Sequence, residues 1–306
     1  MAILIEIERD QEQAHGAATP LGRFVAEFAE SRLALLGLGM FMVVVFIALA
    51  APLISPQNPY DLRQLDIMDG RLPPGSPAAA GFVYLLGSDD QGRDMLSGIF
   101  YGLRISLAVG VASAIIALTI GLTAGLIAAY FGGRVETLIM RVVDLQLSFP
   151  AILVALVLLA VLGQGVDKIV IALVTVQWAY YARTVRSSAL VERRKEYIEA
   201  ARCLALSHAR VVFRHLLPNC LPPLIVVATV QVARAIALEA TLSFLGIGLP
   251  ITEPSLGLLI ANGFEYLLSG KYWISFFPGV ALVVTIVAIN LVGDQLRDVL
   301  NPRLQK

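Results

Sequence analysis

The chain has 306 residues, of which 58% are hydrophobic and only 15% are charged, against roughly 25% charged residues in soluble domains. So little polar surface excludes an ordinary soluble globular protein, and so much hydrophobicity excludes a disordered chain. The 23 basic and 23 acidic residues cancel, so no global charge indicates nucleic acid as a partner, and two cysteines with three histidines are too few for a disulfide framework or a clustered zinc site.

Apolar runs that approach the length of a bilayer recur along the chain. A spanning helix needs about 20 mostly apolar residues, and the runs lack the alternation of a membrane β-barrel. The predicted spans are 33–53, 105–129, 145–162, 169–182, 218–249 and 273–292. The fourth is short, but Lys168 and Arg183 at its ends can extend their charges to the interfaces. We therefore predict an all-α polytopic membrane protein with six transmembrane helices.

The basic residues predict the orientation of these spans. An even number of spans places both termini on one side, and the segments on that side hold sixteen of the 23 basic residues, whereas the opposite segments hold five. The positive-inside rule then makes the termini cytoplasmic, with tails over 1–32 and 297–306 and an external loop over 54–104. Residues 1–32 have no basic region ahead of a short apolar core, so we expect no cleaved signal peptide.

The external loop 54–104 contains several prolines, which exclude helix from much of it. Its last part, 87–94, has the residues of turns and helix N-caps ahead of an amphipathic run over 95–103. We therefore expect a helix to begin there, before the second span.

The longest internal loop lies between the fourth and fifth spans and is strongly basic. Apolar residues recur there at helical spacing, so we predict an amphipathic helix over 192–208 on the cytoplasmic face, with Pro218 ending the helical pattern at the membrane. Taken by periodicity alone, such a helix can simply anchor the loop to lipid headgroups.

Three charged residues fall in or beside the predicted spans, where an unpaired charge is costly and functional roles are common. Asp144 lies three residues after Arg141, and an interfacial pair between them explains it without a role in transport. Arg234 and Glu239 lie deeper and point in different directions. We expect at least one of them, Glu239 first, to face a transport pathway or another subunit.

The internal loop resembles a motif of a known family. Glu199-Ala200-Ala201, then Ala205, then Leu217-Pro218 is similar to the Glu-Ala-Ala loop of permeases from ATP-binding-cassette importers. Ala205 stands where that motif has glycine, and His215 stands where it has an aliphatic residue. We expect Ala205 to lie inside a helix, where the site needs only a small side chain.

The resemblance covers nearly the whole chain, from the first span to Leu304. The chain looks like the second permease of the dipeptide, oligopeptide and nickel group. Leu256 departs from the family pattern, in which we expect Trp at this position. The further stretches that carry the resemblance are Gly87–Asp94 with Ser97, Tyr101–Leu107, Arg141–Asp144, Ser148–Pro150, Tyr181–Arg183, Glu239–Gly248 and Gly293–Asp298.

The resemblance implies a partnership as well as a fold. Residues 105–296 would form a permease core of five spans, with a coupling loop at 187–217 that docks on an ATPase subunit through Glu199, Ala200, Ala201, Ala205, Leu217 and Pro218. It implies a second homologous permease, two cytoplasmic ATPases that bind ATP and Mg²⁺, an external or lipid-anchored substrate-binding protein, and a place in the bacterial inner membrane.

The chain itself has no phosphate-binding loop and no recognisable catalytic or metal motif, so we predict a permease subunit that is not an enzyme and holds no cofactor. Short peptides are the expected cargo, and nickel, glutathione or opines are alternatives within the family. The alternative from another class is a secondary transporter or channel, which would need no cytoplasmic helix with this sequence motif.

Overall fold

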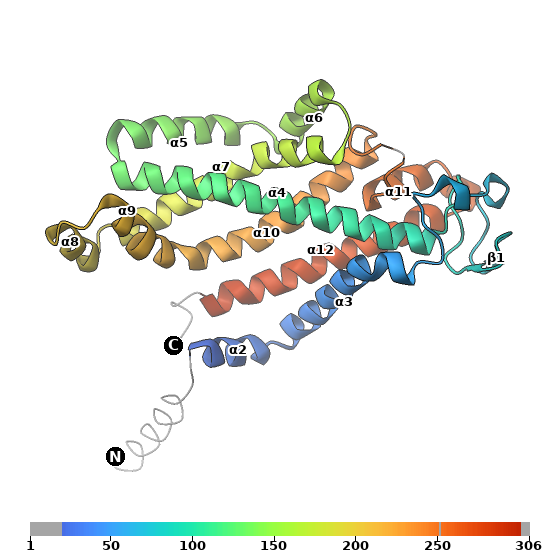
Figure 1. Cartoon of the computed structure of the whole chain (residues 1–306), viewed down its shortest axis with the longest axis horizontal. Coiled ribbons are helices and arrows are strands. Elements are labelled where there is room, and N and C mark those ends of the chain that lie inside the picture. The colour runs from blue at the N-terminus through green and yellow to red at the C-terminus, as the bar shows by residue number, and fades with distance from the viewer. Residues whose placement is uncertain (1–19, 251, 301–306) are drawn as a thin grey trace, which may run out of the picture.

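The computed structural model describes residues 20–250 and 252–300, and it is an elongated bundle whose longest helices run along one axis (Figure 1). The first helices are α2 (Pro20–Glu30) and α3 (Arg32–Ile54). The core follows with α4 (Met95–Phe131), α5 (Gly133–Ser148), α6 (Ala151–Leu162) and α7 (Val166–Glu192). After a short helical segment come α10 (Leu217–Phe244), α11 (Leu256–Phe264) and α12 (Trp273–Leu300). The predicted all-α class is confirmed.

Four helical runs are long and apolar enough to cross a membrane: α3, α4, the continuous run His208–Phe244, and α12. The pair α5 and α6 would be a fifth span if its two bent parts are counted together. The predicted fourth span lies inside α7, which has 27 residues and carries charged residues near both ends. A multi-pass membrane protein is therefore supported, and the count of six stays a prediction.

The predicted third span, 145–162, is wrong as a single helix. The chain bends by 91° between α5 and α6, with Phe149 in an extended conformation and Pro150 at the start of α6. Proline lacks an N–H and disfavours helical backbone in the residue before it, so the helix ends at Ser148 and a new one begins at Ala151.

Close contact between α4 and α7 forms the centre of the bundle. A Cβ atom added to Gly121 would lie 2.4 Å from the carbonyl oxygen of Trp178, and one added to Gly125 would lie 2.6 Å from that of Ala182. These two glycines, four residues apart, let the backbones approach as small residues do in membrane helix pairs.

The segment between α3 and α4 folds at one end of the bundle around two 3₁₀ turns, η1 (Leu62–Gln64) and η2 (Ile67–Asp69), and a two-stranded antiparallel sheet of β1 (Ser76–Pro77) and β2 (Val83–Tyr84). The carboxylate of Asp94 accepts a hydrogen bond from the backbone N–H of Ser97, so it caps α4 as the sequence predicted. Residues 95–104, which we counted within the external loop while expecting a helix to begin there, are the first turns of α4.

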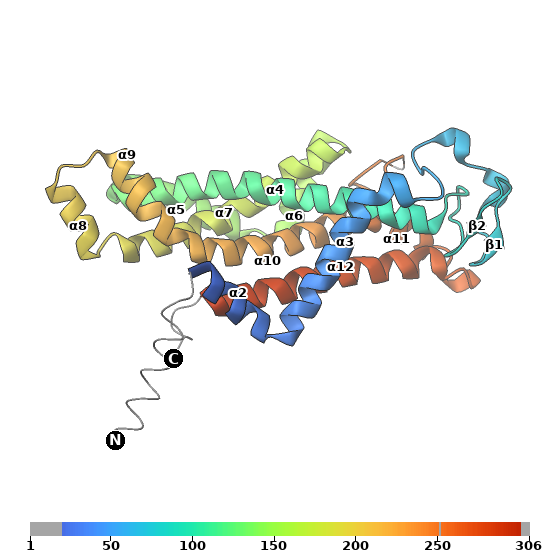
Figure 2. The same cartoon turned by 60° about the horizontal axis from the view of Figure 1, so that its bottom comes forward.

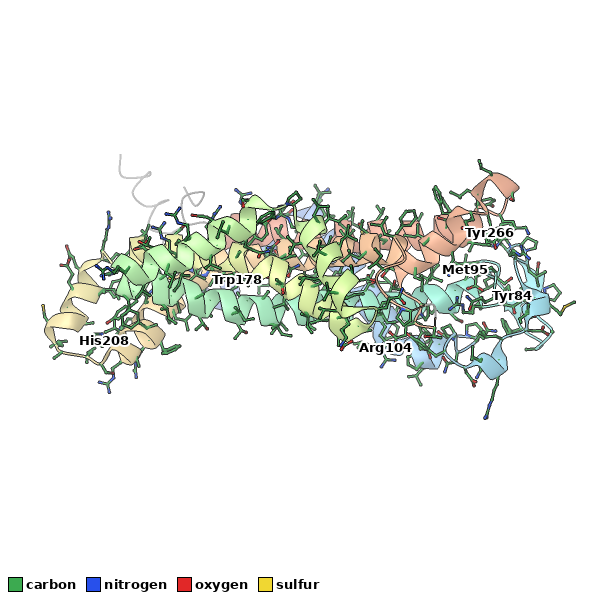
Figure 3. The ribbon with its side chains drawn as sticks, turned by 90° about the horizontal axis from the view of Figure 1, so that it is seen from above. Tyr84, Met95, Arg104, Trp178, His208 and Tyr266 are labelled. Atoms are coloured by element: carbon green, nitrogen blue, oxygen red, sulfur yellow. The ribbon has the colours of Figure 1, made fainter. Side chains whose placement is uncertain are left out.

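Figure 2 shows the internal segment, with α8 (Glu196–Cys203) and α9 (His208–Arg210), at the end of the bundle opposite the strands. Figure 3 places His208 and Tyr84 at these two ends, with Trp178 between them. The side chain of Gln295 in α12 donates to the carbonyl of Glu27 in α2 at 3.1 Å, so the two described ends of the chain lie together.

Candidate functional site

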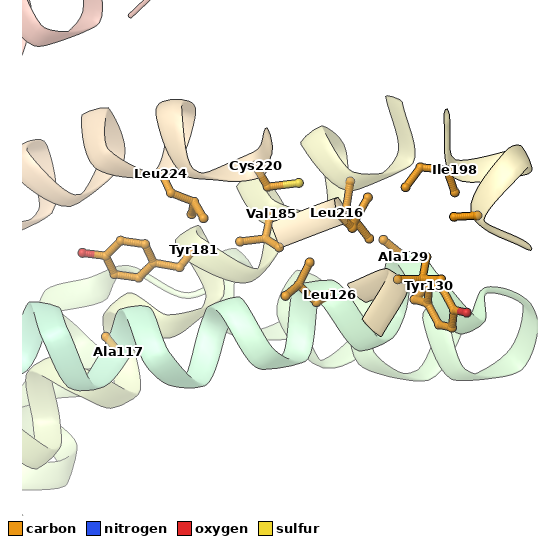
Figure 4. Close-up of a cluster of buried hydrophobic side chains, with 13 residues drawn as sticks. Ala117, Leu126, Ala129, Tyr130, Tyr181, Val185, Ile198, Leu216, Cys220 and Leu224 are labelled. Carbon is orange, nitrogen blue, oxygen red and sulfur yellow. The ribbon is translucent and has the colours of Figure 1, made fainter. Parts of the chain in front are cut away.

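The candidate coupling segment comprises α8, α9 and the π-helix η3 (Val211–Leu216), and it is held on the bundle by one face of α8. Ile198 and Ala201 are buried at 1% and 4% exposure, in a cluster that includes Tyr130 and Leu216 (Figure 4). The opposite face of α8 is exposed, and it presents Glu199 and Ala200. Glu199 and Ala200 are therefore free to meet a partner, whereas Ala201 packs within its own chain and cannot line an external groove.

The end of α8 corrects our expectation for Ala205. This residue is exposed and has a φ of +53°, in the left-handed region, and the backbone N–H of Leu206 donates to the carbonyl of Ala201 at 3.2 Å. That bond closes a Schellman turn, in which a left-handed residue ends a helix. Ala205 is thus the C′ residue of α8 and not a helix-interior residue, and the position needs positive φ, which favours glycine.

Two contacts join the coupling segment to the last turn of α4, one on each side of α8. Before α8, Nη1 of Arg193 donates to the carbonyl of Ala129 at 2.8 Å. After α8, the hydroxyl of Tyr130 and Nδ1 of His208 lie 2.5 Å apart. The segment is therefore fixed to α4 at its entry and at its exit, through residues that the sequence motif did not identify.

A third set of contacts involves the exposed ring of Tyr197 on α8. Its hydroxyl donates to the carboxylate of Glu192 at 2.7 Å and accepts from the side-chain amide of Asn219 at 3.1 Å. Burial and the neighbouring carboxylate raise the pKa of Tyr197 to about 12, so the hydroxyl keeps its proton at neutral pH. This bridge links α8 to the end of α7 and to the first turn of α10.

The sequence also misplaced the end of the helical pattern at Pro218. Leu217 is half-buried and Pro218 exposed, and both lie in the first turn of α10, directly after η3. Proline lacks the N–H of a regular helical hydrogen bond, but Pro218 stands where η3 passes into α10 and does not interrupt the helical run. Helix therefore continues from His208 through Phe244, and the predicted helix over 192–208 is shortened to Glu196–Cys203 with α9 beginning a separate run.

The Asp144 carboxylate pairs with a different arginine from the one we predicted. Nη2 of Arg183 in α7 lies 2.5 Å from Oδ1 of Asp144 in α5, and both side chains are more than half exposed. A second pair joins Arg186 of α7 to Glu136 of α5. The role of Asp144 is therefore to bridge α5 and α7, and the expected pair with Arg141 is not present.

Glu239 lies inside the packed bundle of this chain, and its expected place on a pathway or against another subunit stays a prediction. Its side chain is completely buried, with one carboxylate oxygen 2.9 Å from the hydroxyl of Ser106 in α4 and the other 2.8 Å from that of Ser243 in α10. Two hydroxyl donors satisfy a carboxylate that would be costly to bury alone. The arrangement explains Glu239 as a tie between α4 and α10.

Arg234, by contrast, lines a large groove. We call this the α10 groove; it has a volume of about 1070 Å³ and lies between α7, α10 and α12. The Arg234 side chain is exposed, and its guanidinium carbon lies 5.7 Å from the ring centre of Tyr180. Of the charged residues that we placed in the membrane, Arg234 is the one that a solute in this groove could reach.

The described residues gather no three histidine, cysteine or acidic side chains at a distance that could hold a metal ion. The described part of the site thus consists of an exposed face of α8, on a segment bonded to α4, and of a groove that Arg234 lines.

Comparison with protein families gives two matches. Residues 121–306 match the model of the binding-protein-dependent transport system inner membrane component. Residues 19–74 match the N-terminal transmembrane domain of oligopeptide transport permease C. The first match covers more than half of the chain and includes the coupling segment.

Similar proteins extend these matches over most of the chain. It is 40% identical to the dipeptide transport system permease protein DppC of Escherichia coli strain K12, over 94% of this chain and 95% of that one. It is 42% identical to a putative peptide transport system permease of Brucella suis, over 88% of each chain. Among solved structures, an inward-facing form of the MetNI methionine ABC transporter matches with a TM-score of 0.55 and 21% identity, over 68% of this chain and 98% of that one, which shows the fold.

Proposed function

We propose that this chain forms one half of the pathway by which an ATP-driven importer brings short peptides into a bacterial cell. The proposal starts from the family: the chain belongs to the binding-protein-dependent transport system inner membrane components. The second half would be a homologous permease. Two ATPase subunits would hold ATP and Mg²⁺ on the cytoplasmic side, and a binding protein would deliver the peptide from outside. Peptides are the proposed cargo because the similar proteins are named as dipeptide and peptide permeases.

The observation that supports the coupling role is that α8 has one buried face and one exposed face. One face packs on the bundle through Ile198 and Ala201, and the other leaves Glu199 and Ala200 exposed at the extreme end of the molecule. A helix that transmits motion must be rigidly joined to what it moves and open toward what moves it. Two hydrogen bonds to α4 supply that rigid joint: Arg193, before α8, bonds to Ala129, and His208, after α8, bonds to Tyr130.

In this proposal the α10 groove is the wall that this chain gives to the pathway. The groove contains Glu192 and Asn219 at its end beside the coupling segment, and Arg234 lines it farther along α10. With the termini and the coupling segment cytoplasmic, as the charge distribution predicts, the groove opens toward the cytoplasm. A secondary transporter with the same fold would need no ATPase on α8.

The test is peptide uptake by cells that carry the full set of subunits. Ala200→Trp and Glu199→Lys change the exposed face of α8, and we expect each to lower uptake at normal membrane abundance because a misfit of this kind typically costs about 1–3 kcal/mol. Ala80→Trp, at an exposed position of the opposite end, and Glu30→Lys, on α2, are the matched controls. Normal uptake by both α8 variants would exclude a docking role for this face.

Orientation is tested separately, by labelling single cysteines with a reagent that does not cross the membrane. Positions within 56–95 should react from outside the cell, and positions within 187–210 should not. External labelling of the second set would reverse the proposed topology.

A further inference from the structure

Arg234 lies near the middle of α10, yet its charge has no acidic partner among the described residues. No described ion pair includes it, and its one described contact is with the face of the Tyr180 ring. A cation–π contact leaves most of the hydrogen-bonding capacity of a guanidinium unused. Because an unpaired charge within a membrane is costly, the exposed guanidinium indicates that something outside this chain meets it.

A second unused donor lies one turn away on the same helix. Gln231 is 2% exposed and lines the same groove, and its side-chain nitrogen Nε2 has no hydrogen-bond partner. The side-chain nitrogen of Gln177 donates to the backbone carbonyl of Gln231 at 3.2 Å, and the side-chain oxygen of Gln177 is likewise without a hydrogen-bond partner. Residues three apart lie on one helix face, so Gln231 and Arg234 line the same part of the groove, and the Gln231 nitrogen would reach a solute there by a change of side-chain rotamer.

The distribution of charge along the groove gives this part a distinct sign. The other charged residues that line it, Glu192, Asp294 and Arg297, belong to the ends of α7 and α12, where acids and a base are mixed. Arg234 is fifteen residues along α10 from Asn219, or roughly 22 Å at the rise of an α-helix. The part of the groove around Arg234 therefore has a single cation and, in Gln231, a buried amide donor.

We propose that Arg234 and Gln231 form a carboxylate-binding site in the α10 groove. A carboxylate has only acceptors, and a guanidinium beside an amide donor matches it with charge-assisted hydrogen bonds. Two sources of this group fit the position: the C-terminal carboxylate of a passing peptide, or an acidic side chain of the second permease. Both sources rest on the proposed function.

The experiment uses the complete complex in proteoliposomes. The binding protein is added to the assay, and the probe is the dipeptide alanyl-alanine. The variants are Arg234→Met, which removes the charge at similar length, Arg234→Lys, which keeps it, and Gln231→Leu. Arg134→Met, at an exposed position on α5 outside the groove, is the matched control. Three quantities are measured: assembly of the complex, ATP hydrolysis without peptide, and ATP hydrolysis and uptake with peptide.

A peptide carboxylate at the site predicts that Arg234→Met assembles normally and keeps its peptide-free ATP hydrolysis, while peptide-stimulated hydrolysis and uptake fall at least tenfold. Arg234→Lys should retain most of both, and Gln231→Leu should fall between them. A partner carboxylate predicts instead that Arg234→Met loses assembly without any peptide, and that Arg234→Lys restores it. Either result supports the site and identifies the source.

The proposal is overturned if Arg234→Met assembles and transports like the wild type, or if Arg234→Lys loses as much as Arg234→Met, because the charge would then be irrelevant. Failure of the proposed function has a different signature, since the wild-type complex itself would then show no ATP-dependent uptake of the peptide.

Discussion

The hydroxyl of Tyr130 and Nδ1 of His208 lie 2.5 Å apart, and this contact joins the last turn of α4 to the first residue of α9. Because α4 packs along α7 at the centre of the bundle, the contact connects the exit of the coupling segment with the core of the permease. The entry is joined to the same turn through Arg193 and Ala129. Movement of α8 should therefore reach the membrane first through α4.

Tyr130→Phe removes this bond and keeps the buried ring. We expect the complex to assemble and hydrolyse ATP, but to move less peptide for each ATP hydrolysed, since one of two connections to α4 is lost. The ratio of uptake to hydrolysis measures the effect. Tyr101→Phe is the matched control, because Tyr101 is also a buried residue of α4 and lies at the opposite end. An unchanged ratio for Tyr130→Phe would remove this contact from the coupling path.

Ala205→Gly should stabilise the end of α8. Ala205 has a φ of +53°, and a non-glycine residue in the left-handed region costs roughly 1–2 kcal/mol, part of which glycine loses again through its greater freedom in the unfolded chain. We expect a net gain of about 1 kcal/mol, seen as slower hydrogen exchange of the amides in α8. Ala200→Gly, within the same helix, should have the opposite sign, and faster exchange in Ala205→Gly would contradict the assignment.

Asp89→Asn should loosen the folded segment between α3 and α4. The Asp89 carboxylate lies 2.7 Å from Nε of Arg93, and these side chains are 0% and 2% exposed. Breaking a buried pair from one side typically costs about 3–5 kcal/mol, whereas Asp167→Asn in the exposed pair with Lys168 should cost less than about 1 kcal/mol. Limited proteolysis of the segment compares the two, and equal resistance would contradict the buried pair.

Asp94 predicts a pH dependence at the start of α4. Burial raises the pKa of its carboxyl above the usual 3.8, against hydrogen bonds from Ser97 that lower it. The folded state then binds the proton more tightly than the unfolded state, so stability falls as pH rises through the window between 3.8 and the raised value. Because asparagine also caps helices, Asp94→Asn should match or exceed the wild type in thermal stability at pH 7 and lose that advantage near pH 4.

Asp94→Ala is the control for the cap itself, and it should cost about 1 kcal/mol at neutral pH. An Asp94→Asn variant that is less stable than the wild type at pH 7 and equal to it at pH 4 would reverse the sign and contradict the effect of burial.

The sequence predicted the class of this protein well, because apolar runs of about twenty residues are typical of membrane-spanning helices and rare elsewhere. It also predicted the cap at Asp94, since the N-cap bond is local. The bend at Phe149 was missed although Pro150 was visible, because a proline within an apolar run is equally compatible with a mild kink. Periodicity could not show that α7 continues through Arg183 and Arg186, which are stabilised by Asp144 and Glu136 of a helix distant in sequence.

The coupling segment was predictable from sequence where it depends on a local motif, and not where it depends on packing between distant residues. Glu199 and Ala200 are exposed as a docking face requires, but Ala201, which shares their motif, is turned inward. The family motif has glycine where this chain has Ala205, and a glycine there already indicates a positive φ. The expectation that Ala205 lies in the interior of a helix was wrong. Tyr130 and Arg193 have no sequence signal, because their partners are 78 and 64 residues away along the chain.

The exposed thiol of Cys203, the last residue of α8, allows the central claim to be tested without engineering a new cysteine, since Cys220 is buried. Membranes that contain the assembled complex are treated with a short thiol-to-amine cross-linker, and the products are identified by mass. We predict one adduct between this chain and an ATPase subunit, absent in Cys203→Ser. Failure of Cys203 and of Ala200→Cys to reach an ATPase, together with an ATPase adduct from Met68→Cys, an exposed residue of η2 in the segment between α3 and α4, would contradict the account.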